Sequence, residues 1–420
     1  MSKVNARAWR VVFAGTTVNL CLGCLYAWSV WLKYLTDSDY MIAQGWKTAL
    51  TAEQAATPAS LCMLIFGLMM FPGGRIQDKL GPRVPVTISA VSVGAGLLIA
   101  GLTKSYGGIL FGFGFLGGLG MGIGYAAPTP AALKWFGSHQ RGLIVGVVVS
   151  GYGGAALYAA PLVKWLITSY GLSTSFVALG ITYFVVICAA GMVLVWPGPD
   201  YVVPMPDNVD RRIAAESDEP SKVDWTPGEV CKTWQVYALI VLFCLNTQAG
   251  ILIIGHAAKM VNPMLKSGYI IVAFGGLMNA AGRVGSGMYS DILGRNRAYI
   301  INAAAAAVCM FALPTIIGAK HLLLSFVAIG LAYWVYGGGL CLLPSYTADF
   351  YGLKNFGLNY AIVNIGWALG AFMPKLGGRI KDITGSYDWA FYLAGTLLLI
   401  AILLALLTKR PEYEKVMGQR

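Results

Sequence analysis

Apolar and polar segments alternate along this chain with a regular spacing. Twelve apolar runs occur near residues 9–32, 54–72, 84–103, 108–133, 142–168, 172–196, 233–258, 268–289, 298–317, 321–347, 357–378 and 387–408. Most have about 20 residues or more, the length at which an α-helix crosses the hydrocarbon core of a bilayer. The pattern predicts an all-α polytopic membrane protein with twelve transmembrane helices.

The longest polar segment separates six runs from six. Residues 197–231 hold six of the 18 prolines and eight of the 18 acidic residues. This composition is typical of an extended linker. We therefore expect an N-terminal six-helix bundle over 1–196, a cytoplasmic linker over 197–231 and a C-terminal six-helix bundle over 232–420.

A polar motif that follows the second run returns after the eighth. Its glycine, aspartate and second glycine repeat at an offset of 213 positions: Gly74, Asp78 and Gly81, then Gly287, Asp291 and Gly294. Such a repeat indicates two pseudo-symmetric bundles. Duplicated transporter units hold their substrate between the repeats near the middle of the membrane.

Composition and charge agree with a membrane location. The chain is 57% hydrophobic and 11% charged, whereas soluble domains carry about 25% charged residues. We interpret the first run as a retained span, because no cleavage signature follows it. With both termini cytoplasmic, 19 of the 30 Lys and Arg residues fall in inner segments and ten in outer ones. Basic residues favour the cytoplasmic side, so we predict this orientation in a cell (inner or plasma) membrane.

The net charge of +12 serves this orientation, and no segment suggests nucleic-acid binding. The eight cysteines lie almost entirely in apolar runs, where they act as small hydrophobic residues. We expect no metal and no cofactor. No Ser/His/Asp, paired-carboxylate or His-rich constellation occurs inside the spans, so we do not expect an enzyme.

Arg283 is the basic residue that cannot easily be assigned to the end of an apolar run. An arginine deep in a span costs roughly 2.5–3.5 kcal/mol, so intramembrane charge indicates function by default. Its planar guanidinium suits a carboxylate held by two parallel hydrogen bonds. Asn279 precedes it by four residues and shares its helix face. The alternative is that Arg283 extends to the cytoplasmic surface from the last turns of its helix.

Twelve spans, a central loop and the repeated loop motif resemble the major facilitator superfamily. Within it, Asn279 and Arg283, followed by Ser286, Gly287 and Asp291, resemble the monocarboxylate transporters and the bacterial oxalate:formate antiporters. Tyr26-Ala27-Trp28 in the first span fits the same group, and the resemblance covers essentially the whole chain. It implies a secondary transporter that binds a carboxylate.

Two departures from these families narrow the expected substrate. The oxalate antiporters carry a lysine on span eleven, where this chain has Trp367. One arginine beside a tryptophan suits one carboxylate with a small apolar tail, because a second buried carboxylate would need its own cation. The animal monocarboxylate transporters carry an acid where this chain has Asn279, so their proton-relay residues do not transfer.

Aromatic residues mark the predicted pathway. Tyr125, Tyr333, Tyr336 and Trp367 join Asn279 and Arg283 as expected substrate contacts. Tyr333 and Tyr336 are three residues apart and should share a helix face. Packing is the alternative for Tyr125, and an interfacial aromatic belt is the alternative for the span-ten tyrosines.

The sequence also suggests residues for proton coupling and for gating. For proton coupling the candidates are Arg283 and His256, a histidine near the outer end of span seven that is otherwise a packing or surface residue. For gating at the cytoplasmic helix ends they are Asp78, Arg83, Asp291 and Arg297, with solvated loop charge as the alternative.

These features predict a functional monomer in the lipid bilayer that moves a small monocarboxylate such as lactate or pyruvate. We expect alternating access with proton symport. Carboxylate exchange of the oxalate/formate type and a non-transporting carboxylate sensor are the alternatives. A channel is disfavoured because the sequence has no charged pore ring or filter repeat.

Overall fold

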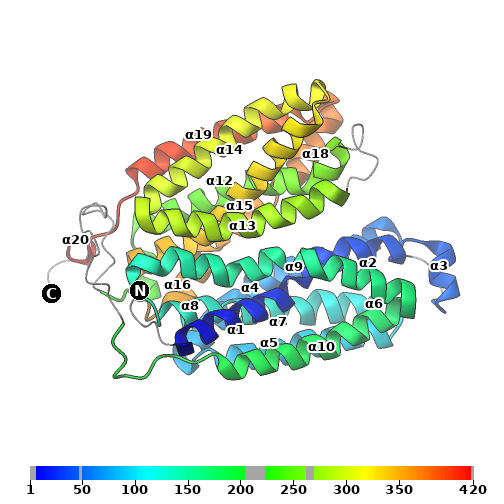
Figure 1. The fold of residues 1–420 in the computed structure, drawn as a ribbon, viewed down its shortest axis with the longest axis horizontal. Coiled ribbons are helices and arrows are strands. Elements are labelled where there is room, and N and C mark those ends of the chain that lie inside the picture. Colours follow the sequence, from blue (N-terminus) through cyan, green and yellow to red (C-terminus); the bar gives the residue numbers. More distant parts are fainter. Residues whose placement is uncertain (1–5, 47–49, 204–222, 262–268, 418–420) are drawn as a thin grey trace. The chain divides into compact units, whose positions relative to one another are not determined.

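The structure, a computed structural model, describes residues 6–46, 50–203, 223–261 and 269–417. Contacts group the chain into two compact units. The N-terminal unit comprises residues 4–135 and 151–201, and the C-terminal unit comprises residues 1–3, 136–150 and 202–420. Within the described ranges every regular element is a helix (Figure 1), so the all-α prediction is confirmed.

Eleven of the described helical segments are long and apolar enough to cross a membrane. The remaining predicted span, 268–289, corresponds to helix α13 (Tyr269–Leu293), which has 25 residues and carries Asn279, Arg283 and Ser286. The twelve runs of the sequence therefore all correspond to helices. The division into two bundles at 197–231 stays a prediction, and residues 204–222 of the expected linker lie outside the described residues.

The N-terminal unit is built from the first four predicted spans, the second part of the fifth and the sixth. Its elements are α1 (Ala6–Leu22), η1 (Gly23–Ala27), α2 (Trp28–Leu35), α3 (Ser38–Ala43), α4 (Ala52–Leu80), α5 (Arg83–Leu102), α6 (Tyr106–Ile109), the π-helical η2 (Leu110–Gly117), α7 (Gly118–Tyr125), α8 (Pro128–Leu133) and α10 (Leu172–Val193). Helix α5 packs on α10 and α7, and α4 packs on α7 and η2. The glycines of η2 and α7 allow these contacts, since a side chain at Gly112 or Gly122 would collide with a neighbouring backbone oxygen.

Helix α9 (Arg141–Tyr170) contributes its first ten residues to the C-terminal unit and the rest to the N-terminal unit. The other C-terminal elements are η3 (Ser138–Gln140), α11 (Pro227–Val230), α12 (Trp234–Val261), α14 (Arg295–Gly318), α15 (Leu322–Tyr351), α16 (Phe356–Val363), α17 (Ile365–Gly370), α18 (Met373–Thr384), α19 (Asp388–Leu407) and α20 (Tyr413–Met417), together with α13. Helix α15 packs along α13, α14 and α12 (Figure 1).

The sequence repeat is accompanied by similar backbone angles at matching positions of the two units. Gly81, which ends α4, has φ = 84°, and Gly294, which precedes α14, has φ = 89°. Only glycine adopts such angles without steric cost. Two non-glycine residues with positive φ, Lys104 (45°) and Lys320 (53°), stand at matching turns before the fourth and tenth spans. Matching loop conformations therefore accompany the matching motifs.

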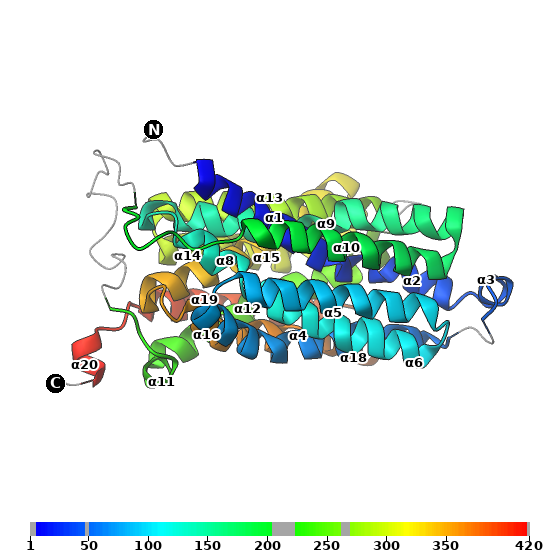
Figure 2. The same ribbon diagram turned by 90° about the horizontal axis from the view of Figure 1, so that it is seen from below.

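The end of the central segment is anchored within the C-terminal unit. Asp224 Oδ1 accepts hydrogen bonds from the Leu353 and Lys354 amides, each at 3.0 Å. The buried Trp225 ring lies edge-on to Tyr351 and Tyr413, with centroid distances of 5.7 and 4.9 Å. Figure 2 shows α20 beside α11 in the same region. These contacts fix the end of α15, the helix that carries much of the site described next.

Candidate functional site

Arg283 lies inside the C-terminal unit with 1% of its surface exposed. Its Nε donates to Asn279 Oδ1 at 3.1 Å, and its Nη1 donates to the backbone oxygen of Val149 at 2.6 Å. The first bond follows from the four-residue spacing on α13, since such residues are neighbours on a helix. The second comes from α9 and has no signal in the sequence. Burial of the whole side chain is contrary to an arginine that extends to the membrane surface.

No acidic side chain pairs with Arg283 among the residues that the structure describes. Both of its hydrogen-bond acceptors are neutral oxygens. A buried charge without a counter-charge is costly, and natural proteins pair such groups. The guanidinium has five N–H donors in a planar fork, which matches the two oxygens of a carboxylate.

Arg295 provides a direct comparison, because it is nearly as buried, at 6% exposure. Its Nη1 lies 2.7 Å from Asp291 Oδ1, and its Nε lies 2.8 Å from Asp349 Oδ2. Arg295 thus has two internal carboxylates where Arg283 has none in the described part. Opposite charges within ion-pair distance give Arg295 a structural role and leave Arg283 as the carboxylate-binding candidate.

The three consecutive glycines of α15 bring polar residues of two other helices, α13 and α12, close to its backbone. Each glycine faces a different neighbour: a side chain at Gly337 would collide with Asn279, one at Gly338 with Ser286, and one at Gly339 with Asn246. The glycines lie within the 30-residue helix α15, which continues through them without a break. The glycines therefore act as contact points that hold Asn279, and with it Arg283, against α15.

Tyr333 and Tyr336, which are expected to share a helix face, contact different neighbouring helices. The Tyr333 ring lies against Gly275 of α13, and the Tyr336 ring lies against Gly250 of α12. Three residues turn an α-helix by about 300°, so the two side chains diverge by about 60°. In this bundle that angle is enough to direct them at different neighbours.

Trp367 and Tyr336, two of the predicted substrate contacts, are hydrogen-bonded to each other. Trp367 Nε1 of α17 donates to Tyr336 Oη of α15 at 3.1 Å. Tyr336 is fully buried and Trp367 is partly exposed. The pair presents aromatic surface and contributes no charge.

Tyr125 belongs to the N-terminal unit, at the end of α7. Its ring lies 5.3 Å from that of Tyr152 and 5.5 Å from that of Phe66, centroid to centroid, and Tyr152 also meets Tyr26. The residue is thus part of an aromatic cluster in its own unit. His256 lies in α12, and its side chain is outside the described residues.

The expected gating residue Asp291 lies in a network with residues that were not predicted from the sequence. Its two carboxylate oxygens accept from the Gly142 and Leu143 amides at 2.7 and 2.8 Å. A carboxylate at a helix N-terminus is stabilised by the free amides and the helix dipole. Asp291 therefore caps α9 while it pairs with Arg295.

Asp349 connects the same network to a second arginine. It lies 2.7 Å from Arg141 Nη1 in addition to its contact with Arg295. Two sequence signals could have pointed to these residues: Arg295 follows Asp291 by four positions, and Asp349 is an acid directly after an apolar run.

The other expected gating residues lie elsewhere. Arg297 is exposed at the start of α14, and the ion pair with Asp291 is formed by Arg295. In the N-terminal unit Arg83 donates from Nη2 to the Met192 backbone oxygen at 2.9 Å, and Asp78 is partly buried near the end of α4.

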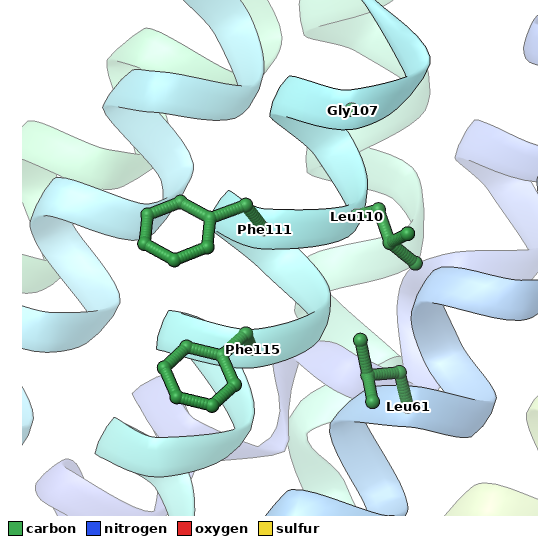
Figure 3. A pocket seen from close by; sticks show the side chains of 5 residues that line it. All are labelled: Leu61, Gly107, Leu110, Phe111 and Phe115. Atoms are coloured by element: carbon green, nitrogen blue, oxygen red, sulfur yellow. The ribbon is translucent and has the colours of Figure 1, made fainter.

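An apolar hollow of about 270 Å³ opens on the N-terminal unit, lined by Leu61, Gly107, Leu110, Phe111 and Phe115 (Figure 3). The two phenylalanine rings stack with centroids 5.7 Å apart. Without a charged or hydrogen-bonding side chain, this hollow does not suit a carboxylate. Throughout the described ranges, no three His, Cys, Asp or Glu side chains gather as a metal site would need.

The amino-acid sequence is similar to those of known membrane transporters. Residues 11–374 match the profile of the Major Facilitator Superfamily. The oxalate:formate antiporter of Oxalobacter formigenes is 25% identical over 406 residues, which cover 95% of this chain and 90% of the antiporter. Monocarboxylate transporter 13 of Rattus norvegicus is 23% identical over 363 residues, which cover 83% and 78% of the two chains.

Solved structures of two sugar symporters show the same fold. The proton:xylose symporter XylE aligns over 98% of both chains with a TM-score of 0.69 and 14% identity. The E. coli fucose:proton symporter FucP aligns with a TM-score of 0.63 and 12% identity, covering 94% of this chain and 98% of FucP. At this identity the likeness concerns the fold alone.

Proposed function

The chain belongs to the major facilitator superfamily and is related to the oxalate:formate antiporter and the monocarboxylate transporters, and from this premise we propose that it transports small monocarboxylates of the lactate and pyruvate type. Arg283 binds the carboxylate. The observation that carries the proposal is a fully buried guanidinium whose acceptors, Asn279 Oδ1 and Val149 O, are both uncharged. A substrate carboxylate supplies the missing negative charge.

The aromatic pair of Trp367 and Tyr336 supports a single carboxylate and a small apolar tail. A dicarboxylate such as oxalate would need a second cation, and this pair provides none. Burial of an unpaired carboxylate is strongly unfavourable. Tyr333 on α15 and Tyr125 of the N-terminal unit are proposed as further substrate contacts.

Proton symport by alternating access is the proposed mode. The carboxylate of the substrate takes up a proton during the cycle while it is paired with Arg283, and His256 is a second candidate proton carrier. Asp291, Asp78, Arg83 and Arg297 are proposed as gating residues, to which the network adds Arg141, Arg295 and Asp349. The protein works as a monomer in the cell membrane with both termini cytoplasmic. Exchange is the second candidate mode, because one relative is named as an antiporter.

The direct test is uptake of labelled L-lactate into proteoliposomes with an acidic exterior. We expect accumulation above the equilibrium level that disappears when a protonophore collapses the gradient. Uptake that is equally fast without the gradient would reject proton coupling. Absence of lactate, pyruvate and short keto-acid flux in both uptake and counterflow assays would reject the function itself.

A Trp367→Lys variant should shift the preference toward dicarboxylates. The new ammonium group beside Tyr336 would pair with a second carboxylate, while the apolar tail of lactate would lose its contact surface. We expect the ratio of oxalate to lactate uptake to rise by about tenfold or more, the change that ~1.4 kcal/mol gives. Initial rates with both labelled substrates measure this ratio.

Trp367→Phe is the matched control, because it removes the indole N–H and keeps the aromatic surface without adding charge. It should leave the oxalate-to-lactate ratio near that of the wild type. An unchanged ratio in Trp367→Lys would show that residue 367 does not contact the substrate.

A further inference from the structure

We propose that the backbone carbonyl of Val149 replaces the substrate carboxylate on Arg283 whenever the carrier reorients without substrate, so that this protein performs net transport and is not an obligatory exchanger. This inference rests on the proposed function, since it concerns the same arginine. It deepens that function by naming the group in the protein that allows net transport, the property that separates symport from obligatory exchange.

The first support is the contact itself. At 2.6 Å, the distance between Arg283 Nη1 and Val149 O is short for an N–H donor, and charge-assisted hydrogen bonds are the shorter and stronger ones. A carbonyl oxygen has two lone pairs, so it can accept this N–H and its own helical amide together. Val149 is itself buried in α9, which keeps water from competing for the bond.

The second support is the way the helices make room for the contact. One turn before Val149, a methyl group at Gly146 would collide with the backbone oxygen of Arg283. A further turn earlier, Gly142 faces the backbone oxygen of Gly287 in the same close manner. Small residues four apart let two helices approach each other. The backbones of α9 and α13 therefore meet at the point where Arg283 bonds to α9.

The physical consequence concerns the carrier without substrate. A buried arginine that lacks an acceptor opposes any step that removes it from water. If the substrate were the sole acceptor, the carrier would cross the membrane only when loaded, which is obligatory exchange. The Val149 carbonyl offers an internal acceptor and so lowers the barrier for the unloaded step. It is uncharged, so a substrate carboxylate displaces it from the same guanidinium N–H group.

The first experiment compares two fluxes of the wild-type protein. Proteoliposomes loaded with labelled L-lactate are diluted into buffer with or without unlabelled L-lactate, with a protonophore present so that no gradient limits the flux. We expect the rate of net efflux to lie within about threefold of the exchange rate, which corresponds to a small difference in activation free energy. If exchange occurs but net efflux is slower than exchange by about 100-fold or more, the proposed role of the Val149 carbonyl is wrong. The proposed carboxylate site at Arg283 would not be affected by that result. Absence of both fluxes rejects the proposed function.

The second experiment uses Gly146→Ala, which moves the α9 backbone away from Arg283 without altering the guanidinium. Net efflux should fall by about tenfold or more while exchange stays within about threefold of the wild type. Retained exchange also shows that the variant folds. Equal loss of both fluxes, or no loss of either, overturns the proposal. If this variant is not recovered in folded form, the wild-type comparison decides the question.

Gly67→Ala is the matched control for this substitution. Gly67 lies in α4, where an added methyl group meets no atom within 4 Å. Both fluxes of this variant should equal those of the wild type, because the change alters helix propensity alone.

Discussion

An Arg283→Gln variant is expected to lose monocarboxylate transport, with kcat/KM lower by about 100-fold or more. Removal of one partner of a buried charge pair costs roughly 2–5 kcal/mol, and the substrate carboxylate would be left buried without a cation. Glutamine keeps an amide donor at the position of Arg283 Nε, so the hydrogen bond to Asn279 Oδ1 within α13 should survive. Labelled-lactate uptake and counterflow measure the loss.

Arg283→Lys separates charge from geometry in the same experiment. An ammonium group keeps the positive charge and lacks the planar fork that binds two oxygens at once. Its activity should fall between those of the wild type and Arg283→Gln. Full transport by Arg283→Gln, with Tm unchanged, would contradict the assignment of the carboxylate site.

An Asp349→Asn variant should show the largest loss of stability. Asp349 bonds to Arg141 at 2.7 Å and to Arg295 at 2.8 Å, and its side chain is 11% exposed. Breaking a buried ion pair by removal of one partner costs about 3–5 kcal/mol. Because Arg141 would then lose its carboxylate partner and Arg295 would keep Asp291 alone, we expect a clearly lower Tm of the detergent-solubilised protein, measured by thermal unfolding.

The exposed pair of Lys415 and Glu412 provides the matched control. Its atoms lie 2.9 Å apart, as close as those of the buried pairs, but the side chains are 75% and 62% exposed. Surface pairs contribute about 0–1 kcal/mol, so Glu412→Gln should leave Tm nearly unchanged. Equal Tm values for Asp349→Asn and the wild type would mean that the network adds no stability to the C-terminal unit.

Several features followed from local sequence alone. The spans follow because about 20 apolar residues are enough to cross a bilayer as a helix. Asn279 follows from its four-residue spacing to Arg283, and the bond between them is present at 3.1 Å. Gly81 and Gly294, which repeat at the same offset in the sequence, have similar backbone angles, with φ of 84° and 89°. Each of these depends on residues close together in the chain.

Other features needed contacts between distant segments. The sequence offered Arg297 as a basic gating residue, whereas Arg295 is the one that turns toward Asp291 and Asp349. Two positions rotate a helix by about 200°, so the choice depends on which face of α14 packs inward. The divergence of Tyr333 and Tyr336 has the same cause.

The sequence was thus enough to predict twelve apolar spans and an arginine deep in the eighth of them, because the length of an apolar run and the position of a charge within it are local properties. The acceptor of that arginine on α9, the capping of α9 by Asp291 and the link from Asp349 to Arg141 came from tertiary packing. These contacts join residues more than 130 positions apart. Their formation depends on helix rotation and on glycines that admit a neighbouring backbone, which no local pattern encodes.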